Sequence, residues 1–162
     1  MRKEVATFRV NGQSRDAIVT PNMTLADVVR DTFQLTGTKE SCRCAECGSC
    51  TVLVDGMPML ACSTLAVSVG SRDIVTIEGL SPPGDLHPLQ KAFVEIGSIQ
   101  CGFCTPGMVM MAKAILDEKP DPTAEEIKEG LGGNLCRCTG YAKIVDAVQT
   151  AARELLVKAG AR

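Results

Sequence analysis

Alternating apolar and polar positions open the chain and predict a β-hairpin. Residues 4–10 and 15–20 alternate in this way on either side of Asn11 and Gly12. An Asn-Gly pair between two alternating segments is a strong signal for a tight two-residue turn, because both residues tolerate positive φ. The first 20 residues are therefore expected to form two antiparallel strands.

A helix and further strands are expected after this hairpin. Thr24 is a candidate N-cap with Asp27 three residues later. The apolar face of that helix is made of Leu25, Val28, Val29 and Phe33. Residues 51–54, 57–61 and 74–77 then have strand character. This order of strands, helix and strands predicts a small β-grasp arrangement.

Beyond residue 79 the pattern changes to helices. Residues 79–85 contain two prolines and two glycines, which is typical of a linker. Four helical segments follow. The first has the apolar face Leu89, Phe93, Val94 and Ile96, and the second has Pro106 in its first turn and ends before Pro120. The third begins with the capping box of Thr123 and Glu126, and the fourth carries an apolar series from Tyr141 to Leu155.

These elements predict an α+β fold with two parts. We expect an N-terminal ferredoxin-like β-grasp domain over residues 1–79, a linker over 80–85 and a four-helix bundle over 86–162. His87, the only histidine, precedes Pro88 and is expected to cap a helix or to lie at the surface rather than to act in catalysis. A single histidine excludes a serine-type triad and a histidine-rich metal site.

Composition narrows the class of protein. The 162 residues are 45% hydrophobic and 22% charged, as in an ordinary globular protein. The formal net charge of −2 excludes a strongly basic nucleic-acid surface. No apolar run approaches the ~18 residues of a membrane span, and no apolar segment follows the basic residues near the N-terminus, so we expect a cytoplasmic protein.

Eight of the nine cysteines fall into two sets of four. The first set has the spacing Cys-x4-Cys-x2-Cys followed by a more distant cysteine, and comprises Cys42, Cys47, Cys50 and Cys62. The second joins a Cys-x2-Cys pair to a Cys-x-Cys pair, and comprises Cys101, Cys104, Cys136 and Cys138. In a cytoplasmic chain the thiols stay reduced, which favours metal ligands over disulfides.

Iron and zinc are the two metals to consider. The first spacing is that of plant-type two-iron, two-sulfur ferredoxins, and three ligands in one loop favour an iron–sulfur cluster over structural zinc. The second set, taken by itself, suits either metal. Glycines near the cysteines, such as Gly48 and Gly102, suit loops whose amides turn toward a cluster.

Longer segments around the cysteines resemble one family. Residues 100–108 (QCGFCTPGM) and 133–141 (GNLCRCTGY) resemble two signature segments of the iron–sulfur subunits of molybdenum hydroxylases, the xanthine oxidase and carbon monoxide dehydrogenase group. Residues 36–40 and 47–56 resemble the ferredoxin-like half of the same subunits, and the likeness covers about residues 4–155. Features around Cys62 and the C-terminus also resemble the small subunit of 4-hydroxybenzoyl-CoA reductase.

The resemblance implies cofactors and partners. Each cysteine set would hold one [2Fe–2S] cluster, a molybdopterin-type cofactor would lie in a large partner subunit, and FAD in a medium subunit. The complex would be a dimer of heterotrimers. The helical domain's cluster would lie nearer molybdenum and the ferredoxin-like cluster nearer the flavin. Gln100 and Cys138 match positions that approach the pterin.

One loop departs from the family pattern. Ser41 and Ala45 stand where the family usually has glycine, and an additional cysteine, Cys44, lies inside the loop. Cys44 is a bystander, a fallback ligand or the sign of a rebuilt cluster. The x4 spacing between Cys42 and Cys47 favours Cys42 as the ligand.

The resulting hypothesis is an electron-transfer subunit that contains no substrate site. It would relay single electrons between molybdenum and flavin in an oxidative hydroxylase or dehydrogenase of a small aromatic, heterocyclic, aldehyde or carbon monoxide substrate. The alternatives are the small subunit of a dehydroxylating 4-hydroxybenzoyl-CoA-type reductase, a free-standing ferredoxin-like carrier and a zinc-stapled interaction module.

Overall fold

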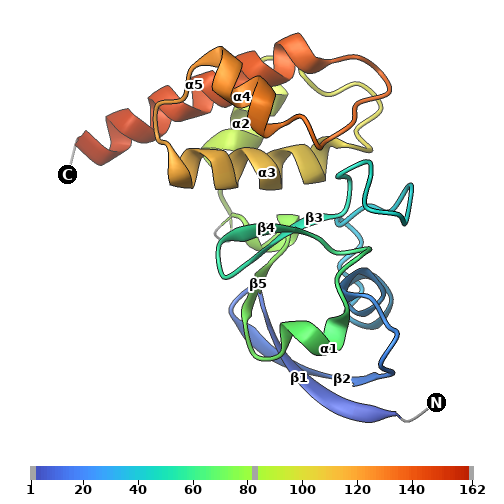
Figure 1. Cartoon of the computed structure of the whole chain (residues 1–162). Helices are drawn as coiled ribbons and strands as arrows, with labels where there is room; N and C mark the ends of the chain where they lie inside the picture. Colours follow the sequence, from blue (N-terminus) through green and yellow to red (C-terminus); the bar gives the residue numbers. More distant parts are fainter. Residues whose placement is uncertain (1–2, 82–83, 161–162) are drawn as a thin grey trace.

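The structure, a computed structural model, describes residues 3–81 and 84–160 and has two stacked parts (Figure 1). The lower part is built on a five-stranded sheet, and the upper part consists of helices. Pro82 and Pro83, which belong to the expected linker 80–85, lie outside the described residues. The expectation of an α+β fold is confirmed.

The sheet begins with the expected hairpin. Strands β1 (Glu4–Val10) and β2 (Gln13–Val19) pair antiparallel, and the turn residues Asn11 and Gly12 have φ angles of 51° and 76°. The expectation of a two-residue turn is confirmed, because both turn residues adopt the left-handed conformation that such turns require. The second strand starts two residues earlier than its alternation predicted.

The remaining strands complete a mixed sheet in the order β2-β1-β5-β3-β4. Strands β3 (Thr51–Val54) and β4 (Met57–Leu60) form a second antiparallel hairpin, and β5 (Asp73–Val75) runs parallel to β1 and antiparallel to β3. The prediction of a strand through residue 77 was wrong at its end, because the chain turns into a 3-10 helix, η2 (Ile77–Gly79).

The first helical segment differs from a regular α-helix. Its main part, η1 (Asp27–Thr32), has π-helical winding, and the Phe33 N–H donates to the Val28 carbonyl five residues earlier. The expected cap is present, since Thr24 Oγ1 accepts the Asp27 N–H at 3.1 Å. A short helix, α1 (Ala66–Val69), was not predicted, because four residues carry too little periodicity to be recognised.

The upper part contains four helices: α2 (Pro88–Glu95), α3 (Thr105–Glu118), α4 (Ala124–Gly130) and α5 (Tyr141–Gly160). The predicted caps are confirmed. His87 Nδ1 accepts the Leu89 N–H at 3.2 Å, and Thr123 forms a capping box with Glu126. Within the described residues, no helix is long and apolar enough to cross a membrane.

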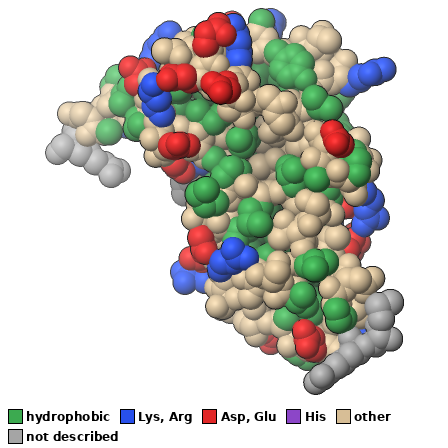
Figure 2. All heavy atoms as spheres, in the orientation of Figure 1, with side chains coloured by type: hydrophobic (Ala, Val, Ile, Leu, Met, Phe, Trp, Pro, Cys, Tyr) green, Lys and Arg blue, Asp and Glu red, His purple; other side chains and the backbone are tan. Residues whose placement is uncertain are grey.

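Each part has its own apolar core, and α3 packs against β3 between them. The lower core is centred on Phe8 and the upper on Phe93, both almost completely buried. Figure 1 places the loop before β3 beside the loops that precede α3 and α5. On the face shown in Figure 2, acidic and basic side chains are interspersed with apolar ones.

Candidate metal centres

The first cysteine set surrounds the start of the β3–β4 hairpin. Cys42 and Cys47 are half-buried in the loop between η1 and β3, Cys50 is buried immediately before β3, and Cys62 is buried just after β4. Cys44 differs from these four because it is exposed. The fold therefore brings a distant cysteine, Cys62, to the three in the loop.

Backbone amides point at the Cys42 sulfur. The N–H groups of Cys44, Cys47 and Glu46 lower the pKa of the Cys42 thiol to about 6, and the Cys44 nitrogen lies 3.5 Å from that sulfur. Interaction with the Cys42 side chain raises the pKa of Cys44 instead. Because amide donors stabilise negative charge on sulfur, the loop favours a thiolate at Cys42 rather than at Cys44.

The second cysteine set lies in two loops at helix ends. Cys101 is exposed between α2 and α3, Cys104 directly precedes α3, and Cys136 and Cys138 lie between α4 and α5. The Phe103 N–H lowers the pKa of the exposed Cys101 thiol. Gly102, between these two residues, has a φ of 82°, a conformation that glycine adopts without strain.

The thiols of each set interact with one another. Cys42 interacts with Cys47 and also with Cys44, and Cys50 interacts with Cys62; in the second set Cys101 interacts with Cys138 and Cys104 with Cys136. Within residues 3–81 and 84–160, no three Cys, His, Asp or Glu side chains are close enough to share one metal ion. Two thiol pairs per set match the donors of a cluster that contains two irons.

Burial opposes ionisation at one thiol of each set. It raises the pKa of Cys50 to about 12 and that of Cys104 to about 12. A thiolate is the form that binds iron, so metal binding has to displace these protons. The donor set and the inward-facing amides fit two [2Fe–2S] clusters, with burial protecting one side of each.

The two cysteine loops are in direct contact. The Leu135 N–H donates to the Cys47 carbonyl at 2.9 Å, and the side chain of Asn134 donates to the Gly48 carbonyl, also at 2.9 Å. Asn134 is only 4% exposed. These two bonds connect the two residues that precede Cys136 with the backbone of the first loop.

Glycines allow this close approach. A Cβ added to Gly107 would lie 2.4 Å from the Gly48 carbonyl oxygen, and one added to Gly48 would lie 2.5 Å from the Gly133 carbonyl oxygen. A side chain at either position would force the backbones apart. Next to the contact lies a cavity of about 410 Å³ whose lining includes Cys47, Cys104 and Cys136.

Two further polar side chains contact the second cysteine set. The Tyr141 hydroxyl accepts the Cys136 N–H at 2.7 Å, and Gln100 Nε2 donates to the Cys138 carbonyl at 3.1 Å. The sequence places Tyr141 on the apolar face of a helix and in the signature segment 133–141, but it does not predict the hydrogen bond to Cys136. The contact of Asn134 with the first loop is not predicted either.

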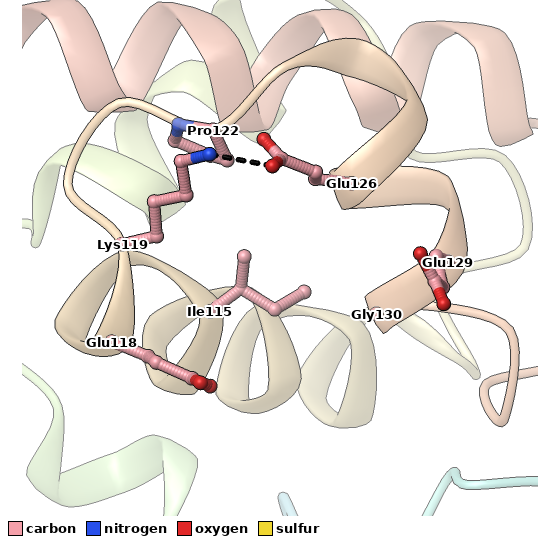
Figure 3. A pocket seen from close by; sticks show the side chains of 7 residues that line it. All are labelled: Ile115, Glu118, Lys119, Pro122, Glu126, Glu129 and Gly130. Atoms are coloured by element: carbon pink, nitrogen blue, oxygen red, sulfur yellow. Dashed lines mark hydrogen bonds and ion pairs between the residues drawn. The ribbon is translucent and has the colours of Figure 1, made fainter.

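The larger cavity between α3 and α4 is unrelated to the cysteines. It has a volume of about 570 Å³, and an ion pair between Lys119 and Glu126 spans it (Figure 3). Its lining residues are Ile115, Glu118, Lys119, Pro122, Glu126, Glu129 and Gly130, so no thiol faces it. The cysteine loops are the better candidate for chemistry.

Comparison with known proteins agrees with the two thiol sets. Residues 2–95 match the model of a family described as "2Fe-2S iron-sulfur cluster binding domain", and residues 76–149 match that of a "[2Fe-2S] binding domain". The nicotinate dehydrogenase small FeS subunit of Eubacterium barkeri is 47% identical, covering 93% of this chain and 96% of that protein. The chain belongs to the small iron–sulfur subunits of the xanthine oxidase family of molybdenum hydroxylases.

Solved structures of this family have the same fold. Quinoline 2-oxidoreductase from Pseudomonas putida 86 matches over 98% of both chains, with a TM-score of 0.92 and 45% identity. Aldehyde oxidoreductase from Desulfovibrio gigas matches 96% of this chain with a TM-score of 0.91 and 42% identity, but only 17% of its own length is covered. The family's iron–sulfur segment is thus a separate chain in some members and part of a longer chain in others.

The interloop contact predicts an effect of Asn134→Ala. The Gly48 carbonyl keeps the Thr51 N–H and hydroxyl as donors, so loss of the one hydrogen bond from Asn134 is expected to lower the free energy of unfolding by about 0.5–1.5 kcal/mol. Urea denaturation of the cluster-loaded chain measures the change. Asn22→Ala, in an exposed turn, is the control and is expected to have little effect. Equal effects of both substitutions would contradict a special role for the Asn134 contact.

Proposed function

We propose that this chain is the electron-transfer subunit of a molybdenum hydroxylase and relays single electrons through two [2Fe–2S] clusters. The observation that carries the proposal is the hydrogen bond from Leu135 to Cys47, which joins a neighbour of Cys136 to a cysteine of the other set. When bound, the clusters supply one-electron redox chemistry, and the chain fixes their separation, order and environment.

The ligands of the first cluster are Cys42, Cys47, Cys50 and Cys62, and those of the second are Cys101, Cys104, Cys136 and Cys138. The interactions among the thiols of each set support this assignment. The amides directed at Cys42, together with the exposure of Cys44, favour Cys42 over its neighbour as a ligand.

This assignment predicts different results for two neighbouring serine substitutions. Cys44→Ser is expected to keep four irons per chain and both cluster spectra, because Cys44 is not needed as a ligand. Cys42→Ser is expected to lose or strongly alter the spectrum of the first cluster alone. Iron analysis and electron paramagnetic resonance of the reduced protein measure both results. Loss of the first cluster in Cys44→Ser would overturn the assignment.

The backbone provides a hydrogen-bonded connection between the two sets. It runs from Cys47 through its carbonyl to the Leu135 N–H and along the chain to Cys136. Asn134 and the close glycine contact hold this connection at a fixed length. The Tyr141 hydroxyl fixes the Cys136 amide at the other end.

The proposed architecture has a ferredoxin-like β-grasp domain over 1–79, a linker over 80–85 and a four-helix bundle over 86–162. The mixed sheet and the helices α2–α5 support this division. The separate apolar cores support it as well.

The proposed partners are a large molybdopterin-binding subunit and a medium FAD-binding subunit, assembled in the cytoplasm as a dimer of heterotrimers. The aldehyde oxidoreductase of Desulfovibrio gigas supports a stable association, because the corresponding segment is continuous with a much longer chain there. Gln100 and the Cys138 backbone are proposed to face the pterin. Their mutual hydrogen bond holds both at one surface beside the second cluster.

The proposed reaction of the complex is oxidative hydroxylation or dehydrogenation of a small aromatic, heterocyclic or aldehyde substrate. Relatives named for nicotinate, quinoline and aldehydes support this class. The substrate site belongs to the large subunit, so this chain influences rate but not substrate choice.

The function is tested by separating the two loops slightly. In the complex with its partner subunits, Gly107→Ala is expected to slow electron passage between the clusters, because the added Cβ collides with the Gly48 carbonyl. Gly133→Ala is the matched control, since a Cβ there meets nothing within 4 Å. Rapid-mixing spectroscopy after substrate addition follows reduction of each cluster. If neither cluster is reduced by substrate in the unaltered complex, the relay function is wrong.

A further inference from the structure

The first cysteine loop adopts a conformation that its residues do not favour. Arg43 and Ala45 have φ angles of 54° and 64°, in the left-handed region, and no glycine occurs between Cys42 and Cys47. A Cβ is disfavoured in this region, so both residues raise the energy of the loop. Other contacts must therefore hold the loop in place.

The Arg43 side chain supplies such contacts. Its Nη2 lies 2.5 Å from Asp27 Oδ1, and its Nε lies 3.3 Å from Glu40 Oε1. Asp27 is itself fixed, because its Oδ2 accepts the Thr24 N–H at 2.8 Å. The guanidinium thus bridges the loop to η1 and to the segment that precedes the loop.

Glu40 makes this bridge more than a surface ion pair. Its side chain is 15% exposed, and Oε1 is buried without a hydrogen-bond donor, so the nearby guanidinium provides its charge compensation. Arg30 Nε lies 3.7 Å from Glu40 Oε2, and Nη1 of the same guanidinium donates to the Thr38 carbonyl. Two arginines and two carboxylates therefore balance their charges beside the first cysteine set.

We propose that Arg43 is a positioning residue for the first cluster, which fastens the strained 42–47 loop to Asp27 and Glu40 and sets the local charge next to the cluster. The proposal rests on the proposed cluster-binding function. Where the family pattern has glycine at position 45, the conformational freedom of glycine lets the loop adopt this shape. In this chain the ionic bridge of Arg43 has that role instead.

The charge balance has a consequence for reduction. Adding an electron makes a cluster more negative, so nearby positive charge favours the reduced form and nearby negative charge opposes it. Arg43 directly follows Cys42. The other charged groups around this loop include Asp27, Glu40, Arg30, Glu46 and Lys39, together with Arg137, which lines the same cavity as Cys47. Changing either partner of the Arg43–Asp27 pair breaks the same contact but changes the net charge in opposite directions.

The test uses the full chain loaded with clusters and three substitutions. Arg43→Gln is expected to shift the first cluster's reduction potential to a more negative value, and Asp27→Asn to a more positive one. Arg43→Lys keeps the charge and is expected to leave the potential in place. The second cluster is the internal reference and is expected to be unchanged in all three. Redox titration monitored by electron paramagnetic resonance measures each potential.

The rate of iron release to a chelator in the absence of oxygen measures how firmly Arg43 holds the loop around the first cluster. Both Arg43→Gln and Arg43→Lys are expected to release iron from the first cluster about tenfold faster, because a lysine cannot bridge two carboxylates as a guanidinium does. Adding Ala45→Gly to Arg43→Gln is expected to restore slow release, since it removes backbone strain, without restoring the potential.

Shifts of the potential in the same direction for Arg43→Gln and Asp27→Asn, or no shift in either, would overturn the proposal. Unchanged iron release in both Arg43 variants would overturn it as well. An unaltered chain that binds no [2Fe–2S] cluster would instead reject the proposed function. The two failures are therefore distinguishable.

Discussion

The contact between the two cysteine loops is the constraint on which the rest of the structure depends. The backbone of Gly48 lies against Gly107, leaving no room for a Cβ, and the buried Asn134 amide donates to the Gly48 carbonyl. Because the contact is made by backbone atoms, its dimensions do not depend on flexible side chains. The sheet holds one side of the contact through β3, and α3 holds the other. A fixed spacing between two redox centres is what a relay requires.

The loops combine groups that favour thiolates with burial that opposes them. Amides lower the pKa of Cys42 and Cys101, whereas burial raises that of Cys50 and Cys104. Iron binding compensates for the buried, hard-to-ionise thiols, so metal and fold stabilise one another. The glycine contacts and the Arg43 bridge act on the backbone around the thiols. Few aromatic side chains contribute to either core, which leaves these loop contacts with a large structural role.

Local chemistry made part of the fold predictable from sequence. The turn at Asn11, the cap at His87 and the capping box at Thr123 each depend on a few neighbouring residues, and the structure contains all three. The π-helical winding of η1 and the 3-10 turn after Val75 were not predictable, because tertiary packing overrides the periodic pattern there. The cysteine sets were recognisable by spacing. Their mutual contact was not, since Asn134 and Gly48 are 86 positions apart and neither residue type indicates its partner.

The central claim is that this chain holds two [2Fe–2S] clusters close together across the Gly48–Gly107 contact. Electron paramagnetic resonance of the fully reduced, unaltered chain tests it most directly. The account predicts two different signals, each integrating to one spin per chain, with a magnetic interaction between them that disappears when only one cluster is reduced. A single signal, or two signals with no interaction, would contradict it.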